Sequence, residues 1–231
     1  MAHPSPETNT ARPTRTVENY LMSMHVMERD QGEIVAARLA EVLQVAPATV
    51  AMTLKRMERD GWISLRSRGK GIHLTDTGRQ AAFSVIRRHM LTEWLLVNML
   101  KMPILDVHAE AHNLEHAISP QLEERLVQLL GNPQVCPHGN PFPGQEQATR
   151  DWLPLTDLPG GTQATIRRLH ELAEENQELL AFLYHNGLQP GSRVRLVESL
   201  PFNQTLSVET NQGNCTLGFQ AARLVYAQKL P

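Results

Sequence analysis

The sequence has few cysteines, no long apolar run and no strong excess of charge of either sign. Its two cysteines, Cys136 and Cys215, form no Cys-x-x-Cys pair, which argues against a disulfide framework and against a structural zinc site of thiolates. No run of about 18 apolar residues is present, so we expect no membrane span. The Pro- and Thr-rich N-terminus lacks the apolar core of a signal peptide, and we expect a cytoplasmic protein.

Signatures of several enzyme classes are also missing. There is no Gly-x-Ser-x-Gly nucleophile elbow and no Walker phosphate loop. A zinc metalloprotease places Glu directly after the first His of His-Glu-x-x-His, whereas here Glu110 follows His108 by two residues. We therefore expect a protein that is not an enzyme.

Hydrophobic periodicity over the first third of the chain predicts three helices and then two short strands. The helices are expected from Thr16 to about Gln31, from Ala36 to Leu43 and from Ala48 to Arg59. Residues 62–65 and 72–74 alternate like strands around a tip rich in Arg, Lys and Gly. This order is typical of a winged helix-turn-helix domain, whose third helix enters the major groove of DNA.

A basic patch falls on that third helix and on the strand tip. The formal net charge of the 231-residue chain is only −2, so any affinity for DNA must come from such a local patch. A run of charge is often just a solvated surface, but its position here favours contacts with phosphates. The expected phosphate-binding residues are Thr49, Lys55, Arg56, Arg66, Arg68 and Lys70. Ala48 and Met52 are expected near base edges, where apolar contacts and DNA shape would supply specificity.

The middle of the chain is predicted to be helical, with helices from about Thr75 to Lys101, from Ile104 to Ile118 and from Gln121 to Leu130. These helices carry more apolar surface than the packing of one thin layer of helices would bury. The excess indicates a dimer interface. Residues 131–150 form a connector rich in Pro, Gly and Asn.

Short strands joined by Gly-rich turns then predict a small β-barrel from about Asp151 onward. We expect a strand within residues 153–158, a helix within 165–186, and strands near 193–197 and 206–217. The expected fold class is mainly α with small β parts. The expected domains are a disordered tail (1–14), a winged helix-turn-helix (15–75), a helical metal-binding and dimerisation domain (76–148) and a C-terminal barrel (149–231).

The segment from His108 to His116 is rich in metal-ligating side chains. On an α-helix that turns about 100° per residue, His108, His112, Glu115 and His116 share one face about 100° wide. Nitrogen and carboxylate ligands on one face suit a first-row divalent cation. The alternative is a helix whose buried histidines are satisfied by neighbouring carboxylates.

The spacing of these residues limits which of them can bind the same metal ion. His108 and His116 lie about 12 Å apart along a helix axis, whereas the ligands of one ion lie about 2.1 Å from it. They therefore cannot bind the same ion, and each site needs partners from other segments. Two pairs offer them, His89 with Glu93 and Glu171 with Glu174, although each pair alone is more simply a salt-bridged surface.

The chain resembles the DtxR/MntR family of metal-dependent transcriptional repressors over residues 15–231. The resemblance is carried by three motifs: Met57-Glu58-Arg59-Asp60-Gly61, the His108–His116 segment with its His and Glu residues, and the run Cys136-Pro137-His138-Gly139-Asn140-Pro141 continuing to Gly144. It implies that the C-terminal part is an SH3-like (FeoA-like) domain.

The resemblance also implies two metal sites. The primary site would comprise Asn19, His112, Glu115 and His116, and the ancillary site His89, Glu93, His108, Glu171 and Glu174. Glu174 departs from the Gln that is usual at its position. His112 stands where iron-type members have Cys and manganese-type members have Glu, and Asn19 where they have Met and Asp.

The leading hypothesis is a repressor of metal-uptake genes that binds a palindromic operator in double-stranded DNA as a homodimer. Mn(II) is favoured because soft Met and Cys ligands are missing; Fe(II) is the second choice, and Zn(II) or Co(II) would substitute in vitro. One alternative is a metal-independent winged-helix protein with a structural His/Glu cluster, and another is a metalloenzyme tethered to DNA. No membrane and no small organic ligand are expected.

Overall fold

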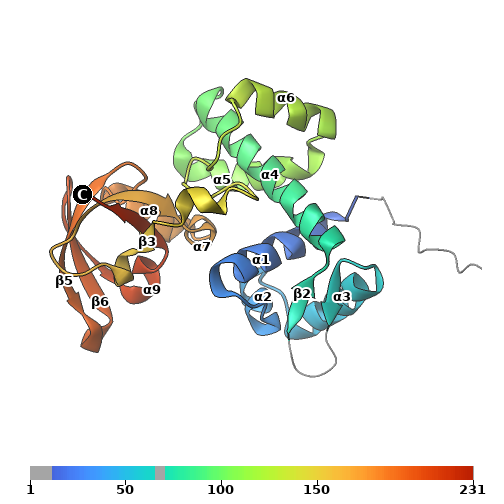
Figure 1. Ribbon diagram of the computed structural model, residues 1–231, viewed down its shortest axis with the longest axis horizontal. Coiled ribbons are helices and arrows are strands. Elements are labelled where there is room, and N and C mark those ends of the chain that lie inside the picture. The colour runs from blue at the N-terminus through green and yellow to red at the C-terminus, as the bar shows by residue number, and fades with distance from the viewer. Residues whose placement is uncertain (1–11, 66–70, 231) are drawn as a thin grey trace, which may run out of the picture. The chain divides into compact units, whose positions relative to one another are not determined.

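The computed structural model describes residues 12–65 and 71–230 (Figure 1). The expected tail therefore falls largely outside the described residues, as do the wing residues Arg66, Arg68 and Lys70. The chain divides into two compact units, Met1–Val85 and Ile86–Pro231, which we describe separately. The three-domain boundaries expected from the sequence stay a prediction.

The first unit has the predicted order of three helices and a two-stranded hairpin. Its elements are α1 (Arg15–Gln31), α2 (Ala36–Val42), α3 (Pro47–Arg59), β1 (Ile63–Leu65) and β2 (Ile72–Leu74). The Thr14 hydroxyl accepts a hydrogen bond from the Val17 amide at the start of α1, and Gly32 ends that helix with a φ of 75°. Pro47 occupies the first turn of α3, where its missing N–H costs nothing.

Apolar residues at helical spacing close the core of the first unit. Leu21 and Met24 of α1, Leu39 of α2 and Met57 of α3 are fully buried. Ile63 pairs with Leu74 across the hairpin and joins the same core. One face of α3 packs against this core, and the opposite face of the helix is exposed to solvent.

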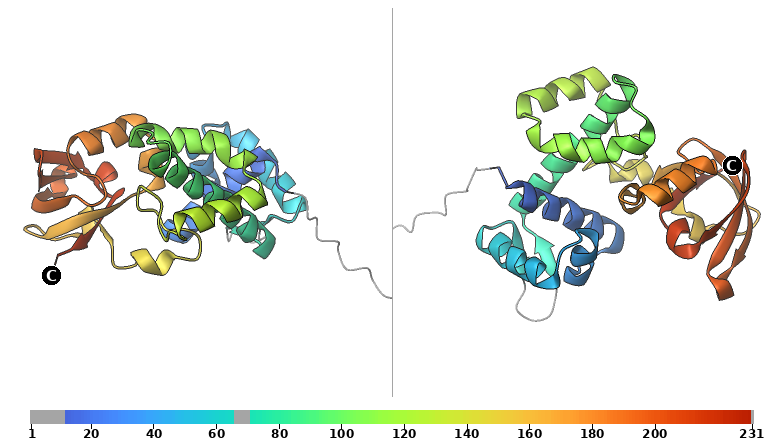
Figure 2. Two further views of the ribbon diagram at one scale, coloured as in Figure 1. Left: turned by 90° about the horizontal axis from the view of Figure 1, so that it is seen from above. Right: turned by 180° about the vertical axis from the view of Figure 1, so that it is seen from behind.

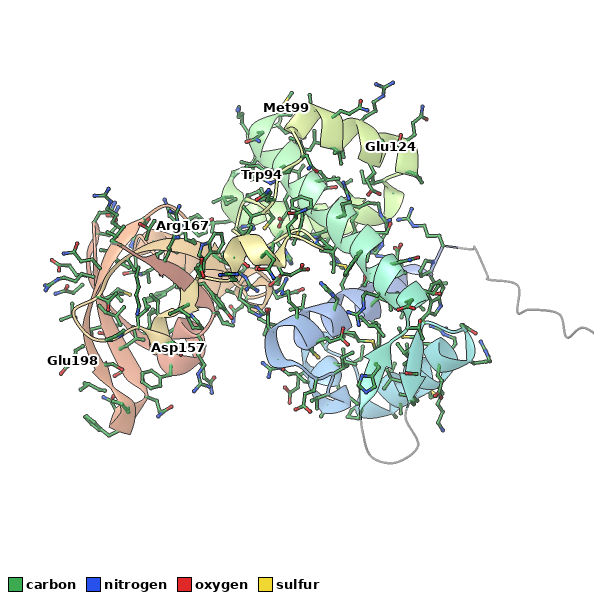
Figure 3. The ribbon with its side chains drawn as sticks, viewed as in Figure 1. Trp94, Met99, Glu124, Asp157, Arg167 and Glu198 are labelled. Atoms are coloured by element: carbon green, nitrogen blue, oxygen red, sulfur yellow. The ribbon has the colours of Figure 1, made fainter. Side chains whose placement is uncertain are left out.

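The second unit begins within α4 (Asp76–Asn98) and continues through α5 (Ile104–Leu114) and α6 (Pro120–Leu130). The prediction of one helix through Ile118 was wrong, because α5 ends at Leu114 and a 3₁₀ turn, η1, covers Glu115–Ala117. Pro120 restricts the preceding backbone, and Ile118 is already extended. The Trp94 side chain (Figure 3) ties α4 to the connector, since its Nε1 donates to the Val135 carbonyl at 2.8 Å.

In the described part of the second unit, six strands form one antiparallel sheet in the order β3-β8-β4-β5-β6-β7. Most of the sheet lies in the orange and red part of the ribbon (Figures 1 and 2). The strands are β3 (Leu153–Pro154), β4 (Gln163–Leu169), β5 (Arg193–Leu200), β6 (Thr205–Thr210), β7 (Gly213–Gly218) and β8 (Val225–Lys229). The remaining elements are the helices α7 (Glu171–Glu174), α8 (Gln177–His185) and α9 (Phe219–Ala222) and the 3₁₀ turns η2 (Glu146–Thr149), η3 (Leu155–Asp157) and η4 (Pro201–Asn203).

The sheet corrects two local expectations. The strand expected within 153–158 has only two residues, and η3 follows it. The helix expected within residues 165–186 is confirmed as α8, but the segment begins with β4, a strand that the sequence pattern does not predict. The strand carries Ala164, Ile166 and Leu169 into the core, where tertiary packing outweighs a weak local pattern.

The described residues include no helix long and apolar enough to cross a bilayer. Several large apolar side chains on α6 and at the end of α4 are nevertheless exposed: Met99, Leu100, Leu122 and Leu129. They belong to the surfaces for which the sequence predicts a dimer interface, and such a patch is characteristic of one.

Gly78, at the start of α4, gives a test of the first unit's packing. A β-carbon at this position would lie 1.9 Å from the Trp62 carbonyl oxygen. We expect Gly78→Ala to lower the free energy of unfolding by about 3 kcal/mol because the backbone has to move. Gly32→Ala is the control: Gly32 has a positive φ but open space around it, so we expect a loss of about 1 kcal/mol. Equal losses in urea unfolding would contradict this packing.

Candidate metal centre

A group of buried side chains converges between α4 and α5. His89 and Glu93 lie one turn apart on α4, and the His89 Nε2 atom is 3.3 Å from Glu93 Oε1. His108 of α5 faces both of them, with its Nδ1 atom 3.2 Å from His89 Nε2 and 3.5 Å from Glu93 Oε1. The helical spacing of the sequence therefore brings three nitrogen and oxygen donors to one point.

Two further donors come from outside these helices. Glu174 of α7 places its Oε2 atom 2.8 Å from His108 Nδ1. His138 of the connector places its Nδ1 atom 3.3 Å from Glu93 Oε1 and 3.4 Å from Glu174 Oε2. We call these five residues the inner cluster: His89, Glu93, His108, His138 and Glu174.

The inner cluster fits a divalent metal ion. Both Glu93 oxygens and both His138 ring nitrogens are buried and have no hydrogen-bond partner within the described structure. Donors about 2.1 Å from one ion lie about 3.0–3.4 Å from each other, depending on the geometry, and the N···O distances above fall near this range. Imidazole and carboxylate donors suit first-row divalent cations, and the thiol of the buried Cys136 also lies within reach of Glu93 and His138.

A second group, the outer cluster, is built by His112, Glu115 and His116. Glu115 Oε1 lies 3.3 Å from His112 Nδ1 and 3.2 Å from His116 Nε2. The main-chain oxygen of Glu115 accepts a hydrogen bond from Arg88 Nε at 3.0 Å, which fixes the η1 turn against α4. Three of the four expected primary-site residues thus lie together although η1 is not α-helical.

Charges in these clusters shift the pKa values of their members. Burial alone would lower the pKa of His89, but the Glu93 charge and the hydrogen bond with Glu115 raise it to about 9. Burial would raise the pKa of Glu115, but hydrogen bonds from His112 and His89 lower it to about 2. Burial opposes the charged form of Glu93 too, yet the His138 and His89 charges hold its pKa well below the usual value.

Asn140 binds the Glu174 carboxylate through the oxygen that does not face His108. Its Nδ2 group donates to Glu174 Oε1 and, at 2.8 Å, to the Leu169 carbonyl. Its Oδ1 atom accepts from Arg168 Nε at 2.5 Å, and the Arg168 guanidinium lies 4.6 Å from the centre of the Tyr226 ring. Since metal ligands depend on such outer partners for their orientation, Asn140 and Arg168 belong to the site.

Gly139 lets the connector approach β4 closely enough for these contacts. Its φ is 91°, and a β-carbon there would lie 2.0 Å from the Arg167 carbonyl oxygen. The Leu169 amide donates to the His138 carbonyl at 2.8 Å. Because Gly139 has no side chain, the connector can pass close to β4, and the neighbouring residues His138 and Asn140 reach their partners there.

Two expected ligands are placed elsewhere. Glu171 does not join the inner cluster, because its Oε2 atom accepts from Arg168 Nη2 at 3.1 Å. Asn19 lies on α1 in the first unit, where its Oδ1 atom is buried without a hydrogen-bond partner. Such a buried oxygen is costly unless something binds it.

His138 belongs to the inner cluster, although the sequence does not predict it as a ligand. The Cys136-Pro137-His138-Gly139-Asn140 motif carries part of the family resemblance, which implies no ligand within it. Two potential ligands within a rigid Pro/Gly loop were the signal that could have found it.

The expected DNA-contacting residues that the structure describes all lie on α3 and are exposed: Ala48, Thr49, Met52, Lys55 and Arg56. Met52 is 67% exposed, so its side chain is accessible on the outer face of α3.

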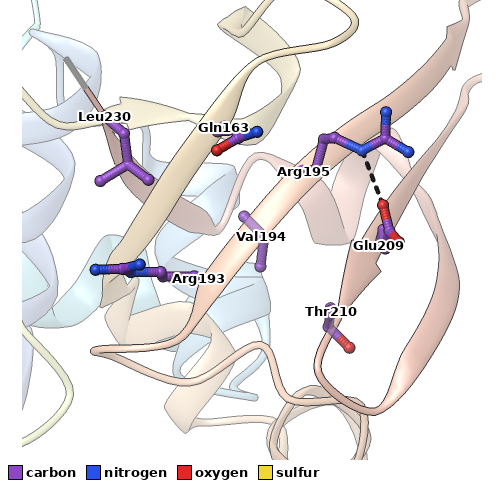
Figure 4. A pocket seen from close by; sticks show the side chains of 7 residues that line it. All are labelled: Gln163, Arg193, Val194, Arg195, Glu209, Thr210 and Leu230. Carbon is purple, nitrogen blue, oxygen red and sulfur yellow. Dashed lines mark hydrogen bonds and ion pairs between the residues drawn. The ribbon is translucent and has the colours of Figure 1, made fainter.

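A shallow pocket of about 340 Å³ lies on strands β4, β5 and β6 (Figure 4). Arg195 donates from Nε to Glu209 Oε2 at 2.8 Å across its floor, and Gln163 and Arg193 also line it. It contains no His or Cys and no member of either cluster, so it is separate from the metal-ligating groups.

Comparison with known families gives three matches along the chain. The N-terminal DNA binding domain of iron dependent repressors matches residues 13–69. The metal binding and dimerisation domain of iron dependent repressors matches residues 75–144, and the FeoA domain matches residues 153–229.

Similar proteins extend over nearly the whole chain. The iron-dependent repressor IdeR of Mycobacterium leprae is 34% identical over 226 residues, covering 93% of this chain and 97% of that protein. The diphtheria toxin repressor of Corynebacterium diphtheriae is 32% identical over 194 residues, covering 79% and 84%. A solved manganese-dependent transcriptional repressor in complex with manganese has a TM-score of 0.81 at 30% identity, covering 93% of this chain and 100% of that chain.

The shifted pKa values give a test in the metal-free protein. His89, with its pKa raised to about 9, adds stability that is complete below pH 6.5 and is lost as the pH rises through 9. Glu115, with its pKa lowered to about 2, adds stability that is complete above pH 4.5 and is lost as the pH falls toward 2. We expect the free energy of unfolding in chelator to fall from pH 6.5 to 9, and His89→Gln to flatten this decline. An unchanged alkaline decline in the variant would contradict the assignment.

Proposed function

The chain belongs to the DtxR/MntR family of metal-dependent transcriptional repressors, and from this premise we propose that it represses metal-uptake genes when Mn(II) occupies its clusters. The observation that carries the proposal is made in the inner cluster. There the buried carboxylate oxygens of Glu93 and the buried ring nitrogens of His138 have no hydrogen-bond partner in the described residues. Leaving them unsatisfied is costly, and a divalent cation satisfies them together.

Mn(II) is proposed as the physiological metal, with Fe(II) as the second candidate. The outer cluster offers only imidazole and carboxylate donors, which are harder than thiolate or thioether. Relatives are named for iron in one case and manganese in another, so the metal differs among similar proteins. Zn(II) and Co(II) would substitute in vitro because their general affinity for such donors is higher.

The outer cluster would hold the ion that controls DNA binding. His112, Glu115 and His116 supply donors from the second unit, and we propose that Asn19 supplies one from α1. The buried, unpartnered Oδ1 atom of Asn19 supports this role. A bound cation supplies the positive charge that these donors share, and the ligation would select the arrangement of units that suits an operator.

DNA would be bound as a homodimer on a palindromic site. The exposed face of α3 offers Lys55 and Arg56 for phosphates and Ala48 and Met52 for base edges. Since neither Ala48 nor Met52 can form bidentate hydrogen bonds, specificity would depend on thymine methyl groups and on DNA shape.

Metal dependence is tested by measuring DNA binding in anaerobic gel shifts with Mn(II) and with chelator. We expect at least about a tenfold loss of affinity in chelator, and a similar loss for His116→Ala in Mn(II), because the outer cluster loses a donor. His185→Ala is the matched control, since His185 lies at the end of α8 outside both clusters, and it should bind like the wild type. Equal affinity with and without metal would refute the metal switch and favour a structural His/Glu cluster.

The role of α3 is tested by the salt dependence of operator binding. Lys55→Ala should reduce the slope of log affinity against log salt by about 1 per protomer, because one phosphate contact is lost. Lys229→Ala, at the end of β8, removes the same charge outside α3 and should leave the slope unchanged. An unchanged slope for Lys55→Ala would remove this residue from the interface.

A further inference from the structure

His89 takes part in both clusters at once. Its Nδ1 atom lies 2.6 Å from Glu115 Oε2, and its Nε2 atom faces His108 Nδ1 at 3.2 Å and Glu93 Oε1 at 3.3 Å. The side chain is 6% exposed, so water does not compete freely for either nitrogen. A single imidazole therefore separates the inner cluster from the outer one.

Glu115 is divided in the same way. Its Oε2 atom faces His89, while its Oε1 atom faces His112 and His116 at 3.3 and 3.2 Å. The carboxylate is fully buried, so its orientation depends on these contacts. A continuous path of atoms thus runs from the inner cluster through His89 Nε2, His89 Nδ1 and Glu115 Oε2 to Glu115 Oε1.

The chemistry of imidazole determines which ring nitrogen of His89 carries the proton on this path. The 2.6 Å contact is a charge-assisted hydrogen bond, in which Nδ1–H donates to the carboxylate. Ligation through Nε2 requires the lone pair on that atom, so the ring keeps its proton on Nδ1. With the proton on Nε2 alone, Nδ1 would present its lone pair to Glu115 Oε2, and the two would repel.

We propose that the His89–Glu115 hydrogen bond couples the two clusters, so that a divalent cation in the inner cluster increases the affinity of the outer cluster. His89 is then a ligand of one site and a positioning residue for the other. The inference rests on the proposed function, because it assumes that both clusters bind metal. Coupling between binding sites is reciprocal, so a cation in the outer cluster strengthens binding at the inner one by the same factor.

The coupling is measured by calorimetric Mn(II) titration of four proteins: wild type, Glu174→Ala, His89→Gln and the double variant. Paramagnetic broadening of the imidazole signals of His112, His116 and His138 assigns each binding step to its cluster. Glu174→Ala removes a donor of the inner cluster and leaves the three donors of the outer cluster in place. Glu178→Ala is the control, since Glu178 is an exposed carboxylate of α8.

We expect Glu174→Ala to weaken Mn(II) binding at the outer cluster about tenfold when His89 is present and by less than about twofold when it is Gln. Equal effects in both backgrounds, or no effect in either, would overturn the coupling while leaving metal activation intact. Absence of Mn(II) binding in the wild type would overturn the proposed function as well.

A second measurement needs no metal. Nitrogen-15 spectra of the chelated protein should show the His89 ring with a proton on Nδ1 whose signal lies far downfield, as a short hydrogen bond requires. A ring protonated only on Nε2 would overturn the proposal.

Discussion

The fully buried carboxylate of Glu93 constrains the arrangement of the second unit. A charge in an apolar interior is expensive unless opposite charges or hydrogen bonds surround it. In this chain, three imidazoles face Glu93, from α4, α5 and the connector. Each of those segments must be held in place for the carboxylate to remain charged. The helix packing, the glycine in the connector and the hydrogen bonds of Asn140 all serve this requirement.

The same constraint joins the helical part to the sheet. Glu174 reaches the inner cluster from α7, which directly follows β4, and Asn140 binds both Glu174 and the end of β4. Arg168 holds Asn140 on one side and Glu171 on the other. A single guanidinium therefore orients one acidic residue into the cluster indirectly and withholds another from it. This explains why two carboxylates three residues apart have different surroundings.

Local periodicity predicts most of the helices, and it fails where a segment depends on contacts with residues far away in the sequence. The helices of the first unit followed from apolar spacing and from Gly32 and Pro47, because these signals act within one or two turns. The β4 strand was missed because its burial depends on the neighbouring strands β5 and β8, which lie far away in sequence. Among the cluster residues, His89, Glu93 and His108 were nominated from helical spacing and family resemblance. The position of His138 depends instead on a loop that contacts β4, and no local period encodes such a contact.

The inner cluster draws its donors from four separate segments, and the last of them, α7, lies in the final third of the chain. During synthesis the helices α4 and α5 leave the ribosome well before Glu174 does. Until then Glu93 and His108 have no partner from α7, and the nascent polypeptide lacks the complete donor set. The complete donor set is therefore assembled only late in synthesis, in chains that extend through α7, and prematurely terminated chains lack it.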